Sequence, residues 1–267
     1  MGRSATRPSR IWPVEPPQCC ASSMPLFQND GLELAYEDIG AGPALVLIHG
    51  WAASGREWRD HGWVERLSGR RLLMLDVRGH GRSAKPHSPE AYAVPKLAGD
   101  MIALMTALAL PEADVFGYSM GATIALGAAV LAPSRVRSLV DGAAPADPLQ
   151  VTALGRALQG RGEFDPVRLE AYRAYALQDR SNDLPALSAC LEAGLGAPPC
   201  EELAIFGGEA LIAVGTRDRR FEVNQRLSEC LPGGRFLALE EADHMGAFSD
   251  ERFQSAVVGF LDEVSPR

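Results

Sequence analysis

One pentapeptide, Gly117-Tyr118-Ser119-Met120-Gly121, sets the strongest constraint on the fold. It follows the apolar run 113–118, which predicts a buried parallel strand, and it precedes the small-residue segment 120–131, which predicts a helix packed on a sheet. A sharp turn between the two leaves room only for small residues two positions on either side of Ser119. Gly117 and Gly121 meet that requirement. The pattern predicts a serine nucleophile displayed at the tip of a strand-to-helix turn.

The only histidine downstream of this turn is the predicted general base. The chain has five histidines, of which only His244 follows Ser119. In folds that use such a turn, the serine is followed along the chain by the acid and then by the histidine. His244 comes just after the apolar run 235–239, which predicts a strand, so we expect it on a loop at the carboxyl end of that strand. From there its imidazole could reach Ser119.

Three aspartates are candidates for the acid that orients His244. Asp218 follows the apolar run 210–214 and would stand at a strand's carboxyl end, which makes it the preferred choice. Asp141 ends the preceding strand-like run and is the alternative. Asp243 is adjacent to His244 and cannot easily turn back to its Nδ1. The acid would hold the imidazole in one tautomer and stabilise the imidazolium without taking up the proton.

The fourth predicted part of the site is a pair of backbone donors. The apolar run 44–48 leads directly into His49-Gly50-Trp51, and a loop there would offer N–H groups toward the nucleophile. Acyl transfer needs two donors aimed at the developing oxyanion. The N–H of Met120 and the N–H of Trp51 are the predicted pair. His49 is expected to be a structural hydrogen-bonding residue beside the site.

Five ordered motifs resemble the signature of the α/β-hydrolase superfamily, over a span from Gly31 to about Val264. They are His49-Gly50-Trp51, the D-x-R-G-x-G-x-S segment from Asp76 to Ser83, the pentapeptide around Ser119, Gly215 to Asp218, and Asp243-His244. The resemblance implies an α/β fold with a mostly parallel central sheet of about eight strands, flanked by helices and carrying a small helical cap. It also implies that Asp76, Arg78 and Ser83 order a turn near the site.

Residues from about 145 to 205 are predicted to form the cap. Their apolar side chains recur at helical spacing, for example at Leu149, Leu154 and Leu158. A cap over the strand ends would exclude water and wall a mostly apolar substrate pocket, although these stripes could also pack only among themselves. The residues predicted to line the pocket are His49, Trp51, Met120 and Met245.

Composition limits the class of protein. With 267 residues, 46% of them hydrophobic, the chain can bury a substantial core, and residues 24–267 are predicted to form one domain with the cap inserted. The net charge of −8 argues against nucleic acid or an anionic membrane as partner. No metal-binding or phosphate-binding motif is present, so we expect a small-molecule substrate, no metal and no cofactor. A monomer or a homodimer is expected.

The N-terminal segment and the cysteines bear on location. Residues 1–23 lack the apolar core of a signal peptide and are predicted to be a disordered extension, with Met24 a candidate for the native start. The five cysteines show no metal-ligand spacing, and their odd number is a poor basis for a disulfide framework. A reducing cytoplasm is therefore the expected location.

The predicted reaction is hydrolysis of an ester-like bond in a small, largely apolar molecule, through an acyl-enzyme formed on Ser119. The resemblance places the chain near carboxylesterases, enol-lactonases and cofactor-free haloperoxidase-like proteins. Because the nucleophile is a serine, the resemblance counts against the haloalkane dehalogenases and epoxide hydrolases, which use an aspartate. The same triad could serve carbon–carbon bond hydrolysis or acyl transfer. A non-catalytic ligand-binding protein on the same scaffold is an alternative of another class.

Overall fold

The computed structural model describes residues 24–145 and 147–266, and the predictions for residues 1–23 lie outside them. Eight strands of the described chain form one sheet, in the order β1-β2-β4-β3-β5-β6-β7-β8. The strands are β1 (Leu26–Asn29), β2 (Leu32–Ile39), β3 (Ala44–Ile48), β4 (Arg71–Leu75), β5 (Ala113–Tyr118), β6 (Val136–Gly142), β7 (Glu209–Gly215) and β8 (Gly233–Leu239). Only β2 runs antiparallel to its neighbours. The prediction of a mostly parallel eight-stranded sheet is confirmed.

Helices cover both faces of this sheet. They include α1 (Glu57–Asp60), α2 (Trp63–Arg66), α3 (Val94–Ala107), α4 (Met120–Leu131), α9 (Phe221–Cys230) and α11 (Glu251–Val264), with single 3₁₀ turns η1 (Pro89–Tyr92) and η2 (Pro133–Arg135) between strands. Alternate residues of β3 point to opposite faces: Val46 packs with α3, α4 and α9, while Leu47 packs with α1, α2 and α11. No helix among the described residues is long and apolar enough to cross a bilayer.

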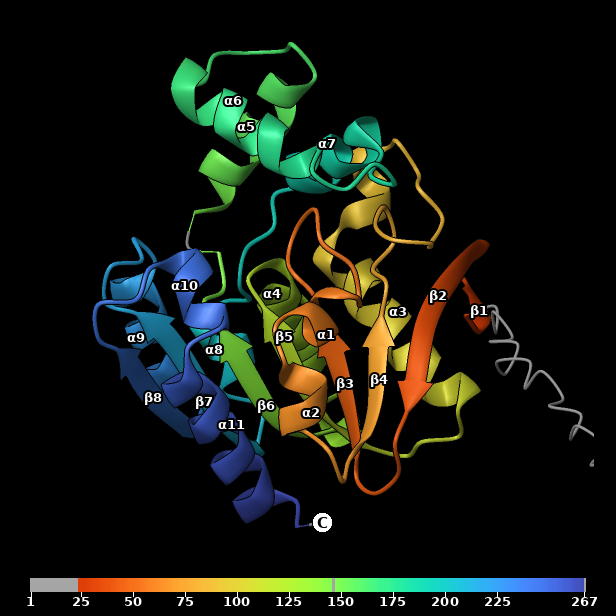
Figure 1. Ribbon diagram of the computed structural model, residues 1–267, viewed down its shortest axis with the longest axis vertical. Helices are drawn as coiled ribbons and strands as arrows, with labels where there is room; N and C mark the ends of the chain where they lie inside the picture. The colour runs from red at the N-terminus through yellow and green to blue at the C-terminus, as the bar shows by residue number, and fades with distance from the viewer. Residues whose placement is uncertain (1–23, 146, 267) are drawn as a thin grey trace, which may run out of the picture.

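Four helices occupy the segment between β6 and β7: α5 (Pro148–Leu158), α6 (Pro166–Ala176), α7 (Leu184–Glu192) and α8 (Cys200–Leu203). We refer to α5, α6 and α7 as the cap, because they lie beyond the arrowheads of β3 to β6 (Figure 1). Each begins at an aspartate, Asp147, Asp165 or Asp183, whose carboxylate accepts a backbone N–H of the first turn. A proline follows in the first turn of each helix, where its missing N–H has no intrahelical partner to lose.

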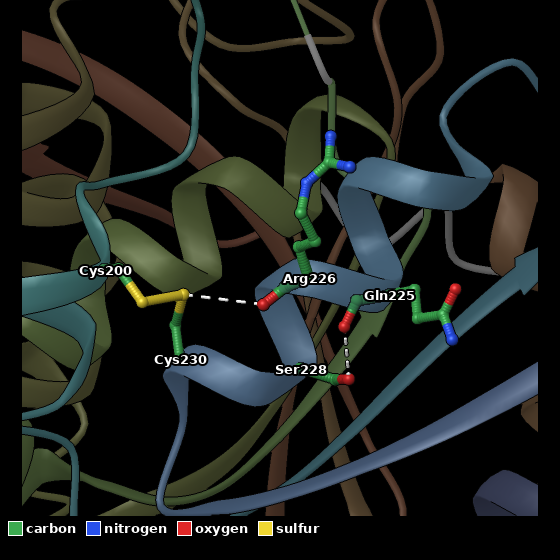
Figure 2. Close-up of a disulfide and its surroundings, with 5 residues drawn as sticks. All are labelled: Cys200, Gln225, Arg226, Ser228 and Cys230. Carbon is green, nitrogen blue, oxygen red and sulfur yellow. Dashed lines mark hydrogen bonds between the residues drawn. A yellow bond between two sulfur atoms is a disulfide. The ribbon is translucent and has the colours of Figure 1, made fainter.

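A disulfide joins α8, which follows the cap in the chain, to α9 of the core. Cys200, at the start of α8, is bonded to Cys230, at the end of α9 (Figure 2). The expectation that the cysteines form no disulfide was therefore wrong. The odd count concealed the pair, because a third cysteine, Cys190, is buried as a free thiol in α7.

Candidate active site

The turn that carries Ser119 has the strained geometry that its sequence predicts. Ser119 lies between the last residue of β5 and the first of α4, with φ 53° and ψ −115°. Such a conformation is costly for a residue with a Cβ and persists only where packing enforces it. Here the Ser119 N–H donates to Gly142 O of β6 at 2.7 Å. A Cβ on Gly121 would overlap Ile48 O of β3, so the turn is held between two strands and admits only glycine there.

His244 is not on a loop, as the sequence suggested, but is the first residue of the short helix α10 (His244–Phe248). Asp243 is its N-cap and accepts the Gly246 N–H at 2.7 Å, so the acidic residue beside the histidine serves the helix. Tyr118 donates its hydroxyl to His244 O at 2.5 Å, and the two rings are stacked with centroids 5.5 Å apart. These contacts fix the imidazole close to the serine.

The three predicted side chains form one hydrogen-bonded chain. His244 Nε2 lies 3.1 Å from Ser119 Oγ, and His244 Nδ1 lies 2.7 Å from Asp218 Oδ2. Because the carboxylate accepts from Nδ1–H, Nε2 carries the lone pair and can accept the serine proton. The second carboxylate oxygen accepts from the Arg220 backbone and side chain, at 3.0 and 3.1 Å. Arg220 thereby fixes the orientation of the acid.

Burial and charge act in opposite directions on this pair. Burial alone would raise the pKa of the Asp218 carboxyl, but the hydrogen bond from His244 and the charges of His244 and Arg220 lower this pKa to about 2. Burial lowers the pKa of His244 below its usual value, and the bond to Asp218 opposes that effect in part. At neutral pH the acid is therefore ionised and the imidazole is neutral, which is the state in which a histidine accepts a proton.

The alternative acid lies away from the imidazole. Asp141 is fully buried at the end of β6, and its Oδ1 accepts the Ala144 N–H at 3.0 Å. Burial raises the pKa of its carboxyl to about 7, although that N–H opposes the shift. Within the described residues, the carboxylate bonded to His244 is that of Asp218. Asp141 instead shapes the turn that leads into the cap.

The loop after β3 places Trp51 and Met120 near the serine. A Cβ on Gly50 would lie 3.7 Å from Ser119 Cβ, so the loop passes beside the nucleophile. The backbone N–H groups of Trp51 and Met120 donate to no protein acceptor in the described part of the chain. The Gly50 N–H, in contrast, donates to Glu57 Oε1 at 2.9 Å. Burial raises the pKa of the Glu57 carboxyl to about 7, although the Gly50 N–H opposes the shift.

Hydrogen bonds with α7 and with the loop before it hold the loop after β3. Trp51 Nε1 donates to Leu187 O of α7 at 3.0 Å, and Asn182 Nδ2 donates to Ala52 O at 2.8 Å. Ala52 itself has a positive φ of 64°, so the loop is strained where Asn182 holds it. The Met120 sulfur lies 3.7 Å from the Cys190 thiol of α7. Both residues that carry the unpaired N–H groups are therefore packed under the cap.

The other two predicted pocket residues have different surroundings. His49 is fully buried, accepts the Val77 N–H at Nε2 and bonds Gly50 O through Nδ1. It joins the loops after β3 and β4. Met245 is 60% exposed beside His244. A hollow of about 300 Å³ lies elsewhere, between the end of α5, the start of α7 and the loop before η1, and its walls include His87, Leu158 and Leu184.

Sequence reasoning missed four residues that support the site: Tyr118, Glu57, Arg220 and Asn182. Arg220 could have been found, because it lies two positions after Asp218 in an Asp-Arg-Arg run. Tyr118 and Asn182 contact residues 126 and 130 positions away, whereas Glu57 contacts Gly50 seven positions away, and no local pattern marks any of the three. No group of three metal-binding side chains occurs within the described ranges.

The chain is similar in sequence to known proteins. Residues 43–191, more than half of the chain, match the sequence family described as alpha/beta hydrolase fold. An epoxide hydrolase of Caballeronia sordidicola is 33% identical over 111 residues, which are 42% of this chain and 34% of that protein. The chain thus spans about a third of the length of this relative.

Two solved structures share the fold over most of both chains. An esterase of Exiguobacterium antarcticum has a TM-score of 0.72 and 24% identity, over 87% of this chain and 97% of that chain. The enol-lactonase of Burkholderia xenovorans has a TM-score of 0.68 and 23% identity, over 90% and 99%.

Proposed function

Because the chain belongs to the alpha/beta hydrolase fold family, we propose that it is a serine hydrolase that cleaves an ester-like bond through an acyl-enzyme intermediate. The observation that carries this proposal is the hydrogen-bonded chain Ser119 Oγ–His244 Nε2 and His244 Nδ1–Asp218 Oδ2, with distances of 3.1 and 2.7 Å. Nucleophile, base and orienting acid are thus within reach of one another.

In the proposed reaction, Ser119 Oγ attacks the carbonyl carbon while its proton passes to His244 Nε2. The carbonyl oxygen becomes an oxyanion, which the N–H groups of Trp51 and Met120 stabilise. The bond to the leaving group then breaks, and the imidazolium gives that group the proton. Water attacks the acyl-enzyme in the same way, losing a proton to His244, and the acid product leaves as Ser119 regains its hydrogen.

Epoxide hydrolysis, suggested by the name of one relative, suits this site poorly. A serine that opened an epoxide would form an ether with the substrate carbon. An ether has no carbonyl for a second water attack, so His244 could not release it. A carboxylate nucleophile would instead form an ester, which water can cleave, but position 119 is a serine.

Hydrolysis of p-nitrophenyl hexanoate tests the proposal. We expect Ser119→Ala to abolish enzymatic release of p-nitrophenol, while Ser181→Ala, at an exposed serine of the cap segment, keeps the wild-type rate. A panel of lactones and β-diketones then separates ester hydrolysis from lactone and carbon–carbon cleavage. Undiminished turnover in Ser119→Ala would exclude Ser119 as the nucleophile.

A further inference from the structure

Three arginines follow β7 in the loop that carries Asp218, and one of them lacks an acidic partner. Arg217 forms an ion pair with Glu241, and Arg220 Nη1 lies 3.1 Å from Asp218 Oδ1. Arg219 forms no ion pair with any carboxylate of the described chain. Its Nη2 donates instead to the hydroxyl of Tyr172 in α6, at 3.0 Å. A phenol is neutral, so the charge of Arg219 is not compensated.

Tyr172 contacts one residue on each side of the active site. Its ring centroid lies 6.1 Å from that of Trp51, which follows β3, and its hydroxyl accepts from Arg219, which follows β7. The strand order between them is β3-β5-β6-β7. Trp51, Tyr172 and Arg219 therefore form a chain of contacts between the loops on either side of β5 and β6, and Ser119 follows β5. This agrees with the position of α6 beyond the carboxyl ends of the strands (Figure 1).

The two sides of the site differ in charge. On the β7 side, three acids are already engaged: Glu241 with Arg217, Asp218 with His244, and Asp243 at the start of α10. Arg219 and Arg220 are close enough to add to the lowering of the pKa of His244, which is due first to burial. On the β3 side the buried Glu57 carboxyl accepts the Gly50 N–H. A chain of net charge −8 thus presents a cation at one rim of its site.

We propose that Arg219 and Tyr172 bind a carboxylate of the substrate, remote from the bond that is cleaved. The guanidinium has further N–H donors beyond the one given to Tyr172, and the Tyr172 oxygen that accepts from Arg219 can donate its own hydrogen. Both donors then meet the same anionic group. This rests on the proposed serine hydrolase function and defines the substrate class as esters or lactones that bear an acid on the β7 side.

The test compares two esters of equal acyl chain length, mono-p-nitrophenyl adipate and p-nitrophenyl hexanoate, which differ in a terminal carboxylate. Rates are corrected with Ser119→Ala. We expect wild type to prefer the adipate ester in kcat/KM. Arg219→Gln should lower kcat/KM for the adipate ester about tenfold, mainly through KM, and change that for the hexanoate ester less than about twofold. Tyr172→Phe keeps the ring on Trp51 and should lose part of the preference.

Arg217→Gln is the matched control, since it removes the same charge from the same loop at a residue paired with Glu241. We expect it to leave the adipate preference unchanged. An unchanged preference in Arg219→Gln, or an equal loss in Arg217→Gln, overturns the carboxylate subsite while leaving serine hydrolysis intact. If neither ester is hydrolysed in a Ser119-dependent manner, the proposed function and the subsite both fail.

Discussion

The core sheet and the cap contribute to the site in different ways. Ser119, Asp218 and His244 follow β5, β7 and β8, parallel strands of one sheet, and His244 bonds directly to the other two. The cap reaches the site through single side chains, such as Asn182 on Ala52 O and Tyr172 on Arg219. On the proposed function, this difference assigns bond cleavage to the core and substrate recognition to the cap. Changes in the core should therefore abolish turnover, and changes in the cap should alter which substrate is bound.

The largest expected effect is at the acid. Asp218→Asn should lower kcat about 10⁴-fold, because the neutral amide neither holds the tautomer of His244 nor stabilises its charged form. The measurement is kcat for p-nitrophenyl hexanoate. Asp141→Asn is the matched control, since Asp141 is a second buried aspartate at the end of a neighbouring strand and bonds only a backbone N–H. A large loss of kcat in Asp141→Asn, with little loss in Asp218→Asn, would reverse the assignment.

Removing the disulfide tests whether the link between α8 and α9 contributes to stability or to catalysis. Replacing Cys200 and Cys230 together by serine should lower the free energy of unfolding by about 2–4 kcal/mol, because the unfolded chain is freed of a cross-link. Urea denaturation measures this, with the reduced wild type as comparison. Cys230 lies just before β8, at the amino ends of the strands, so kcat should stay within about twofold of wild type. A collapse of kcat with unchanged stability would contradict this separation.

Replacing Asn182 tests the contact between the loop before α7 and the loop after β3. Asn182→Ala removes the donors to Ala52 O and Ala176 O and should lower kcat/KM about tenfold, because the strained loop is less firmly held. Steady-state kinetics with the hexanoate ester measure it, and Gln178→Ala, an exposed neighbour in the same segment, is the control. Unchanged kinetics together with a lower Tm would make Asn182 a purely structural residue.

The smallest expected effect is a shift in the pKa of His244. The pKa of His244 is lowered, first by burial, and a neutral imidazole is required, so kcat/KM should rise with pH through an inflection below 6.5. The positive charge of Arg219 disfavours the imidazolium. Its removal in Arg219→Gln should therefore raise the pKa of His244 and move the inflection upward. A pH–rate profile of both proteins measures the shift, and a downward shift would contradict the placement of Arg219.

The sequence predicted the core well because buried parallel strands appear as apolar runs. The predicted strand over 113–118 and helix over 120–131 agree with β5 and α4 to the residue. In this type of site the acid and the histidine follow the serine along the chain, so few combinations of residues had to be considered. The helical start at His244 was missed, although Asp243 is a recognisable N-cap.

The contacts of the cap could not be predicted in this way. Tyr172 meets Arg219 and Trp51 meets Leu187 O only because α6 and α7 fold back over the strand ends, and no local spacing encodes that approach. The disulfide likewise depends on the packing of α8 beside α9. Periodicity identifies a helix, but not which side chains of another element it will contact.

The central claim is that Ser119 is a nucleophile activated by His244, and phosphonylation tests it most directly. A fluorophosphonate should label the folded protein once per chain as Ser119 Oγ displaces fluoride, and peptide mass spectrometry should locate the label on Ser119. Labelling should vanish in Ser119→Ala and slow strongly in His244→Ala. A folded protein that hydrolyses esters but remains unlabelled, or carries the label on another residue, would contradict the account.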